Sequence, residues 1–318
     1  MGGRDSLPAR GARRHAKCIA TALAATLLLA CLSGCTRWFF HPDARLVGTP
    51  ADFGYAYRDV AVRTADGFRL HAWLIEPEGP PTGTVYFLHG NAQNVSTHVR
   101  GVLWLLAAGY RLFALDYRGY GLSEGHPDIP EVFEDIRAGA EWLLEDVDTR
   151  GDRTPLYVFG QSLGASLAIR QLALHPTQRA RLSALVVEAA FTRYGEIARH
   201  AARGHLLTRP LGWPAERLLA GPHDPIDAVA ALAPLPILFV HSVDDRIVPY
   251  AFGVELHAAA GEPKAFLPVT GRHIAAARKA EARRTILRFL EAHTDDSEGR
   301  ARRSTPSGQG SSVGVETP

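Results

Sequence analysis

The feature that most constrains this chain of 318 residues is a regular alternation of short apolar strands and helices. The predicted strands, which read as nearly continuous apolar runs, cover residues 84–88, 110–115, 156–159, 184–187, 237–240 and 265–269. The predicted helices cover residues 96–108, 129–145, 163–175, 250–260 and 274–293. Apolar strands that alternate with helices are typical of a mostly parallel sheet with both faces covered. We therefore expect an α/β fold.

The remaining segments predict how the domain begins, where it is interrupted and where it ends. Two short strands, 59–64 and 69–76, flank Asp66-Gly67, which is a strong hairpin signal and predicts an antiparallel start to the sheet. Residues 192–235 contain five prolines and short helical pieces, and predict a cap-like insertion within a domain of residues 58–293. Residues 294–318 are rich in Ser, Gly, Arg and Pro, and predict a disordered tail.

A serine stands where one predicted strand turns into a helix. The sequence Gly160-Gln161-Ser162-Leu163-Gly164 follows strand 156–159 and opens the next helix. A tight turn at this point would strain the backbone of the serine and expose its hydroxyl, and glycines on either side would avoid collisions with the neighbouring strand and helix. The motif alone is common, but its placement predicts Ser162 as a catalytic nucleophile.

A serine nucleophile needs a base and a carboxylate that orients the base. His273 follows the last predicted strand, in the chain order Ser–acid–His that this strand–turn–helix arrangement uses. Asp245 follows strand 237–240, and Asp244 and Glu188 are alternatives on spacing alone. Because the carboxyl ends of parallel strands gather at one edge of a sheet, we predict that Ser162, Asp245 and His273 form a catalytic triad.

The oxyanion that develops during acyl transfer needs backbone donors. The amide of Leu163 directly follows the nucleophile, and the amide of Asn91 lies in the loop after strand 84–88, so we predict these two as the oxyanion hole. His89 in the same loop is either a buried turn residue or a substrate-facing one.

Three segments resemble the Bem46-like branch of the α/β hydrolases, close to the serine aminopeptidase S33-like families. The segments are Leu88-His89-Gly90-Asn91, Asp116-Tyr117-Arg118-Gly119-Tyr120-Gly121-Leu122-Ser123-Glu124-Gly125 and Gly160-Gln161-Ser162-Leu163-Gly164. The resemblance covers about residues 58–293 and implies the α/β-hydrolase fold, with the acid at Asp245 and the base at His273. It departs at Ser242, where the family has glycine, and at Ile274. We expect Asp116 and Arg118 to brace the site by hydrogen bonds.

The N-terminus has the pattern of a targeting segment rather than of a folded element. Basic residues precede an apolar stretch at 18–32, which is short for a bilayer span, and Leu32-Ser33-Gly34-Cys35 resembles a bacterial lipobox. This predicts a signal peptide over residues 1–34 and a lipid anchor, including palmitate-type acyl chains, on Cys35. Thr36, in place of Asp, favours the periplasm-facing outer membrane of the bacterial cell envelope. An uncleaved anchor helix is the alternative.

Residues 35–57 are predicted to be an anchor and lead-in linker. Trp38, Phe39 and Phe40 stand close to the predicted anchor, where aromatic side chains are favoured at a lipid interface. Packing against the domain is the equal alternative.

Composition excludes several classes of function. The formal net charge is only +2, with much of the basic excess at the two ends, so we expect no nucleic-acid partner. No H-E-x-x-H or Cys/His zinc pattern is present, so we predict no metal and no cofactor. No cysteine follows Cys35, which excludes a disulfide within the domain.

These features predict a membrane-anchored serine hydrolase that cleaves an ester or thioester of a small-molecule acyl substrate through an acyl-Ser162 intermediate. The alternatives are a serine peptidase of small peptides, a catalytically idle envelope binding module, and an intracellular hydrolase whose N-terminus is misread. The apolar cap residues either line an acyl pocket or bury the cap against the sheet; they are Leu206, Leu207, Leu211, Trp213, Leu218 and Leu219.

Overall fold

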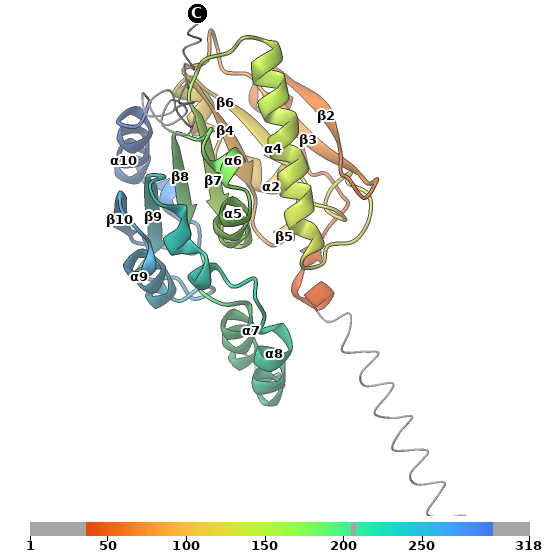
Figure 1. Ribbon diagram of the computed structural model, residues 1–318, viewed down its shortest axis with the longest axis vertical. Helices are drawn as coiled ribbons and strands as arrows, with labels where there is room; N and C mark the ends of the chain where they lie inside the picture. The colour runs from red at the N-terminus through yellow and green to blue at the C-terminus, as the bar shows by residue number, and fades with distance from the viewer. Residues whose placement is uncertain (1–35, 205–207, 295–318) are drawn as a thin grey trace, which may run out of the picture.

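The computed structural model describes residues 36–204 and 208–294, which form a layered α/β body (Figure 1). One sheet has eight strands in the order β10-β9-β8-β7-β4-β6-β3-β2. In chain order the strands are β2 (Tyr57–Arg63), β3 (Arg69–Ile75), β4 (Gly83–Leu88), β6 (Tyr110–Leu115), β7 (Leu156–Gln161), β8 (Ala184–Glu188), β9 (Ile237–Ser242) and β10 (Lys264–Val269). Only the β2–β3 and β3–β6 pairs are antiparallel within this sheet. The predicted fold class and its antiparallel start are therefore confirmed.

A hydrophobic core lies on each face of the sheet. Helices α4 (Glu131–Thr149), α5 (Leu163–Leu174) and α9 (Tyr250–Ala259) pack on one face, and α3 (Trp104–Ala107) and α10 (Ala280–Glu291) pack on the other. Successive side chains of a strand point to opposite faces. In β4, Tyr86 and Leu88 accordingly enter the first core, and Val85 and Phe87 enter the second. This two-sided burial explains why the central strands are apolar throughout.

Two predicted helices differ from the structure. The helix predicted at 96–108 is broken into α2 (Val95–His98), the 3-10 turn η3 (Val99–Gly101) and α3. Asn94 caps α2 and also accepts hydrogen bonds from the hydroxyl and amide of Ser96, and such local side-chain bonds compete with a continuous helix. Gly101, a poor helix former, stands at the break.

The helix predicted at 274–293 begins later than expected. The structure has a 3-10 turn, η7 (Ala276–Arg278), and then α10, which starts at Ala280. Ile274 has a φ of 54°, a left-handed conformation that a right-handed helix cannot include. The loop that carries His273 therefore extends further along the chain than the apolar pattern indicated.

The lead-in segment packs on the domain. It forms the 3-10 turn η1 (Thr36–Phe39) and the short strand β1 (His41–Pro42), which pairs in parallel with β5 (Ala92–Gln93). Phe40 is buried, and the ring of Phe39 packs edge-on against Phe191 and Tyr194 at 5.9 and 5.5 Å. For these two phenylalanines the packing alternative is correct.

The segment 192–235 divides into a helical projection and a part that packs on the body. The projection contains α7 (Tyr194–Arg203), η4 (Arg209–Leu211) and α8 (Gly212–Leu219). The 3-10 turns η5 (Pro225–Asp227) and η6 (Val229–Leu232) follow, and Val229 and Leu232 are buried in the core of the body. Figure 1 shows α7 and α8 side by side below the body of the sheet. A Cβ at Gly195 would lie 2.4 Å from the carbonyl oxygen of Glu216, so the two helices approach closely at this glycine.

Several predictions fall outside the described residues. They concern the signal peptide, Cys35, Leu206, Leu207 and residues 295–318. Among the helices that the structure describes, none is both long and apolar enough to cross a bilayer.

Candidate active site

Ser162 occupies a strained turn between β7 and α5. Its φ of 53° and ψ of −114° lie in a region that side chains other than glycine rarely occupy, at a cost of roughly 1–3 kcal/mol. Its backbone N–H donates to the carbonyl oxygen of Glu188 at 2.8 Å, and the residue is 9% exposed. Such strain persists only where surrounding contacts fix the backbone, and it clusters at functional sites.

The two flanking glycines make this turn possible. A Cβ at Gly160 would lie 2.5 Å from the Cα of Ala165, and a Cβ at Gly164 would lie 2.2 Å from the carbonyl oxygen of Leu88. Both contacts are with backbone, which cannot rotate away. The chain thus needs glycine on both sides of Ser162 in order to bring α5 against β4 and β7.

His273 is bonded to Asp245. Its Nδ1 lies 2.6 Å from Oδ2 of Asp245, whose Oδ1 accepts hydrogen bonds from the amides of Ile247 and Val248 at 2.9 and 3.0 Å. Burial of Asp245 opposes ionisation, but the hydrogen bond and charge of His273 and the two amides hold its pKa below the usual value. An ionised Asp245 fixes the proton of the neutral ring on Nδ1, so Nε2 is the basic nitrogen.

The other two candidate carboxylates have different partners. Oδ2 of Asp244 accepts the amide of Gly271 at 2.9 Å, which ties the two loops together without touching His273. Glu188 is buried beneath the turn, where it accepts from Gln161 Nε2 at 2.8 Å and from the amide of Ala276 at 2.9 Å. Of the three carboxylates that the sequence offered, Asp245 is the one that bonds the imidazole.

Ser162 and His273 line one pocket of about 600 Å³. Further segments complete its wall. They are the loop after β4, with Gly90 and Asn91; the lead-in, with Phe39 and His41; the cap, with Ile197, Leu218 and Leu219; and the loop after β9, with Ile247 and Val248. Among the residues that the structure describes, the hydroxyl of Ser162 makes no hydrogen bond, which leaves it available to a ligand. The nucleophile–base contact of hydrolases commonly tightens when substrate binds.

The predicted oxyanion donors lie at the same pocket. Leu163 and Asn91 both line it, and a Cβ at Gly90 would lie only 3.6 Å from the Cβ of Ser162. The side chain of Asn91 is used elsewhere, since its Oδ1 accepts from His41 N and Tyr120 Oη and its Nδ2 donates to Phe39 O. Its backbone amide is therefore the group that could face an oxyanion.

Sequence reasoning missed His98 as a pocket residue. The imidazole stacks on the ring of His89 at 5.5 Å and its Nε2 bonds the carbonyl oxygen of Ala92 at 2.8 Å. Burial, with a smaller contribution from His89, lowers the pKa of His98 to about 4, so the ring is neutral at neutral pH. A lone histidine in an ordinary helical pattern carries no signal of this placement.

Asp116 and Arg118, the two residues expected to brace the site, have different roles. His89 is fully buried, and Asp116 beside it accepts the amide of Val95 at 2.8 Å. Asp116 thus holds the loop after β4. Arg118 instead bonds Asp135 at 2.8 Å and Asp66 at 2.9 Å. Arg118 supports the fold of that loop and has no direct contact with the pocket.

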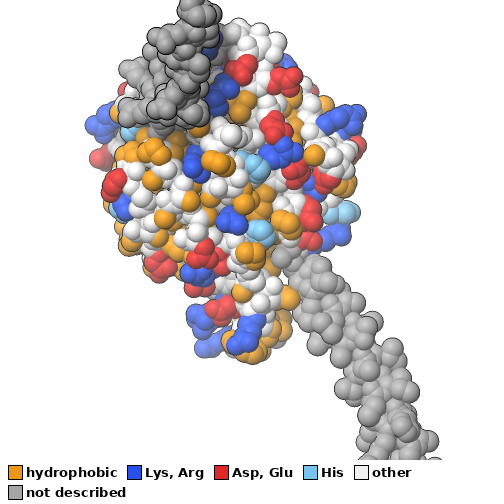
Figure 2. Space-filling view, viewed as in Figure 1, with side chains coloured by type: hydrophobic (Ala, Val, Ile, Leu, Met, Phe, Trp, Pro, Cys, Tyr) orange, Lys and Arg blue, Asp and Glu red, His pale blue; other side chains and the backbone are white. Residues whose placement is uncertain are grey.

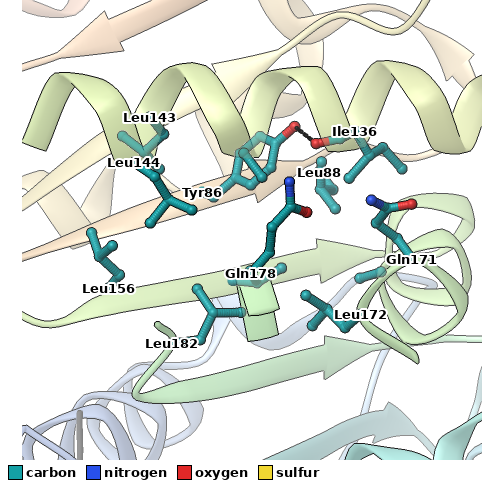
Figure 3. Close-up of a pocket in the computed structure, with 13 residues that line it drawn as sticks. Tyr86, Leu88, Ile136, Leu143, Leu144, Leu156, Gln171, Leu172, Gln178 and Leu182 are labelled. Carbon is teal, nitrogen blue, oxygen red and sulfur yellow. Dashed lines mark hydrogen bonds between the residues drawn. The ribbon is translucent and has the colours of Figure 1, made fainter. Parts of the chain in front are cut away.

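A second hollow lies inside the domain between α4, α5 and the sheet (Figure 3). It measures only about 20 Å³ and is lined by leucines, with the side chains of Gln171 and Gln178 pointing into it. This is room for about one water. It is too small for a substrate and does not include Ser162 or His273. Among the described residues, no group of three or more His, Cys, Asp or Glu could hold a metal ion.

Comparison with known proteins identifies the family. A model of the serine aminopeptidase S33 family matches residues 79–226. The uncharacterized protein YfhR of Salmonella typhi is 30% identical over 251 residues, which cover 74% of this chain and 80% of YfhR. Protein bem46 of Schizosaccharomyces pombe is 29% identical over 227 residues, with 69% and 70% covered.

This chain belongs to the Bem46-like branch of the α/β hydrolases. The fold of this Bem46-like hydrolase is also similar to that of the Pyrococcus furiosus esterase Pf2001, with a TM-score of 0.67, 22% identity and coverage of 80% of this chain and 98% of the esterase. At that identity the likeness concerns the fold alone.

In this Bem46-like hydrolase, Gly164→Ala is expected to be damaging. The new Cβ would meet the carbonyl oxygen of Leu88 at 2.2 Å, so α5 must move away from β4, at a cost of about 1–3 kcal/mol. Urea denaturation of the variant should show that loss of stability, together with weaker activity. The matched control is Gly221→Ala, because a Cβ at Gly221 meets nothing within 4 Å. Equal stability of the two variants would contradict this account of the turn.

Glu188 connects the nucleophile turn to the His273 loop, and Glu188→Ala removes both contacts. The amide of Ala276 and the side chain of Gln161 would lose their buried acceptor, which costs about 1–3 kcal/mol per group. We expect lower stability, and a lower kcat with little change in KM, because the substitution loosens the base without reshaping the pocket. Glu188→Gln should recover much of the stability and of kcat. After rotation of its amide, Gln161 can still form a hydrogen bond with the new side chain.

The charge of Glu188 adds a pH signature. Burial raises the pKa of Glu188, while the bonds from Gln161 and Ala276 partly offset this. A carboxyl with a raised folded-state pKa stabilises the fold at low pH and loses that contribution as pH rises above the unfolded value. As pH rises from acid to neutral, the free energy of unfolding of Glu188→Gln should therefore increase relative to that of the wild type. A pH-independent difference would contradict this reasoning.

Proposed function

We propose that this protein is a serine hydrolase that cleaves an ester or thioester through an acyl-Ser162 intermediate. The observation that carries the proposal is the His273–Asp245 bond at the pocket where Ser162 stands on its strained turn. A nucleophile, a base and an orienting carboxylate together are the elements of acyl transfer. Membership of the α/β hydrolases supports the same reaction class.

The proposed reaction has two halves. Ser162 Oγ attacks the acyl carbon while His273 Nε2 takes its proton, and Asp245 stabilises the resulting imidazolium. The amides of Leu163 and Asn91 bond the oxyanion. The leaving alcohol or thiol departs with the proton from His273. Water then attacks the acyl carbon and gives a proton to His273. The bond to Oγ breaks while His273 returns that proton to Oγ, which releases the acid and restores the serine.

The pocket wall favours an acyl substrate. On the cap side it presents Phe191, Ile197, Leu218 and Leu219, and among the described residues that line it none is Asp or Glu. An apolar wall suits the hydrocarbon of an acyl chain. A peptidase that captures a free α-amine would need a carboxylate facing that amine, so the small-peptide alternative has less support here. Leu211 and Trp213 are exposed and lie outside the acyl wall.

Purified full-length protein assayed with p-nitrophenyl esters of graded chain length, beside aminoacyl p-nitroanilides, tests this function. We expect turnover of the esters with a preference among chain lengths, and little release from the anilides. Faster cleavage of the anilides would favour the peptidase. No turnover of either class, with biological activity retained in a Ser162→Ala strain, would favour the idle binding module.

We further propose that Cys35 carries a lipid anchor and that the protein faces the periplasm from the outer membrane. The lipobox-like Leu32-Ser33-Gly34-Cys35 supports this, as does the absence of Asp after the cysteine. Cells grown with labelled palmitate should incorporate the label into the wild type and not into Cys35→Ala. Label that survives the substitution contradicts the anchor, and recovery with inner-membrane fractions would correct the location.

A further inference from the structure

The tip of the cap combines exposed apolar side chains with a hollow lined by arginines. Trp213 is 63% exposed and Leu211 is 58% exposed. Arg199, Arg203 and Arg209 line a hollow of about 460 Å³, together with Pro210, Gly212 and Trp213. Figure 2 shows these two kinds of side chain, hydrophobic and basic, gathered on the projection at the lower end of the molecule.

Most of the positive charge at this tip has no acidic partner. Arg199 is bonded to Glu216 at 3.0 Å. Arg203, Arg209 and Arg217 have no carboxylate within 4.0 Å among residues 36–204 and 208–294. The guanidinium of Arg217 instead lies over the ring of Trp213, 4.7 Å from its centroid. Arginine is the side chain best suited to phosphate, because its planar fork bonds two oxygens at once.

The chain enters the domain on the same side. The red-orange segment with which the described chain begins, η1, lies at the same end of the body as α7 and α8 (Figure 1). Phe39 and the cap residues Leu218 and Leu219 line the same pocket, which places the lead-in next to the cap. Cys35, the proposed lipid attachment site, directly precedes Thr36. Membrane attachment through Cys35, as proposed above, would bring the cap tip close to the lipid surface.

We propose that the tip formed by the end of α7, η4 and the first turn of α8 docks on an anionic phospholipid bilayer. In the docked state Trp213 and Leu211 enter the interface, where tryptophan is favoured, and Arg203 and Arg209 bind headgroup phosphates. Both the apolar side chains and the arginines are needed for stable contact, because a small apolar area alone or a few charges alone bind lipid only weakly. The docked cap holds the mouth of the Ser162 pocket at the membrane surface.

Full-length protein reconstituted in vesicles tests the docking without depending on turnover. The vesicles contain phosphatidylcholine alone or mixed with phosphatidylglycerol, and both kinds carry brominated acyl chains, which quench nearby tryptophan. The signal of Trp213 is the difference between the wild type and Trp213→Phe. We expect Trp213 to be quenched in the mixed vesicles and much less in phosphatidylcholine. High salt should weaken the quenching, because it shortens the range of charge interactions.

The arginines are tested by a matched pair of double variants. Arg203→Gln with Arg209→Gln should lower the ratio of docked to undocked protein by about thirtyfold, as expected for two charges at an anionic surface. Arg284→Gln with Arg288→Gln removes the same charge from α10, away from the cap, and should leave quenching unchanged. The proposal would be overturned if Trp213 were not quenched in the mixed vesicles. It would also be overturned if the quenching depended neither on lipid charge nor on Arg203 and Arg209.

Discussion

Ser162→Ala is expected to lower kcat by about a millionfold, because the acyl intermediate can no longer form. The loss should fall on kcat rather than on stability. Among the described residues no group bonds the Ser162 hydroxyl, so its removal strands no buried partner. Initial rates on the best ester, beside thermal unfolding of both proteins, measure the two quantities. A variant that unfolds at the wild-type temperature but keeps more than a small fraction of activity would exclude Ser162 as the nucleophile.

Asp245→Asn is expected to lower kcat by about ten-thousandfold. Oδ1 of Asp245 accepts two amides, from Ile247 and Val248, so the amide oxygen of the substituted side chain must stay in that position. Its NH₂ group then faces His273 and donates to Nδ1. The ring proton is forced onto Nε2, and His273 can no longer take a proton from Ser162.

Asp244→Asn is the matched control for this prediction. Within the described part of the chain, the side chain of Asp244 accepts one hydrogen bond, from the amide of Gly271 through Oδ2, and an amide oxygen can do the same. We expect a loss below about tenfold, because the substitution leaves His273 untouched. A larger loss in Asp244→Asn than in Asp245→Asn would move the acid to Asp244, against the geometry of the described loop.

Much of the fold and part of the site could be predicted because their signals are local. The period of the strands, the Asp66-Gly67 turn and the glycines beside Ser162 each report a conformation within a few residues. The break in the helix predicted at 96–108 was missed because the decisive bonds come from Asn94, just outside the apolar pattern. Periodicity alone does not register such competition.

The parts of the pocket that were missed depend on contacts across long stretches of chain. Asn91 bonds His41 and Phe39, about fifty residues away, and this brings the lead-in to the pocket wall. Arg118 likewise pairs with residues that are distant in the sequence. Its partners Asp135 and Asp66 lie 17 and 52 residues away, and they are not part of the site. The sequence offered three carboxylates for one histidine, and Asp245, the one that the sequence analysis preferred, is the one that bonds His273.

Labelling of the full-length protein with a fluorophosphonate probe measures whether Ser162 is an activated nucleophile, because the probe reacts only with an activated serine. We predict strong labelling of the wild type, none in Ser162→Ala, and slow labelling in His273→Ala and Asp245→Asn. Labelling that persists in folded Ser162→Ala would place the reactive serine elsewhere. A folded wild type that takes no label would contradict the hydrolase mechanism and leave the binding module as the account of this site.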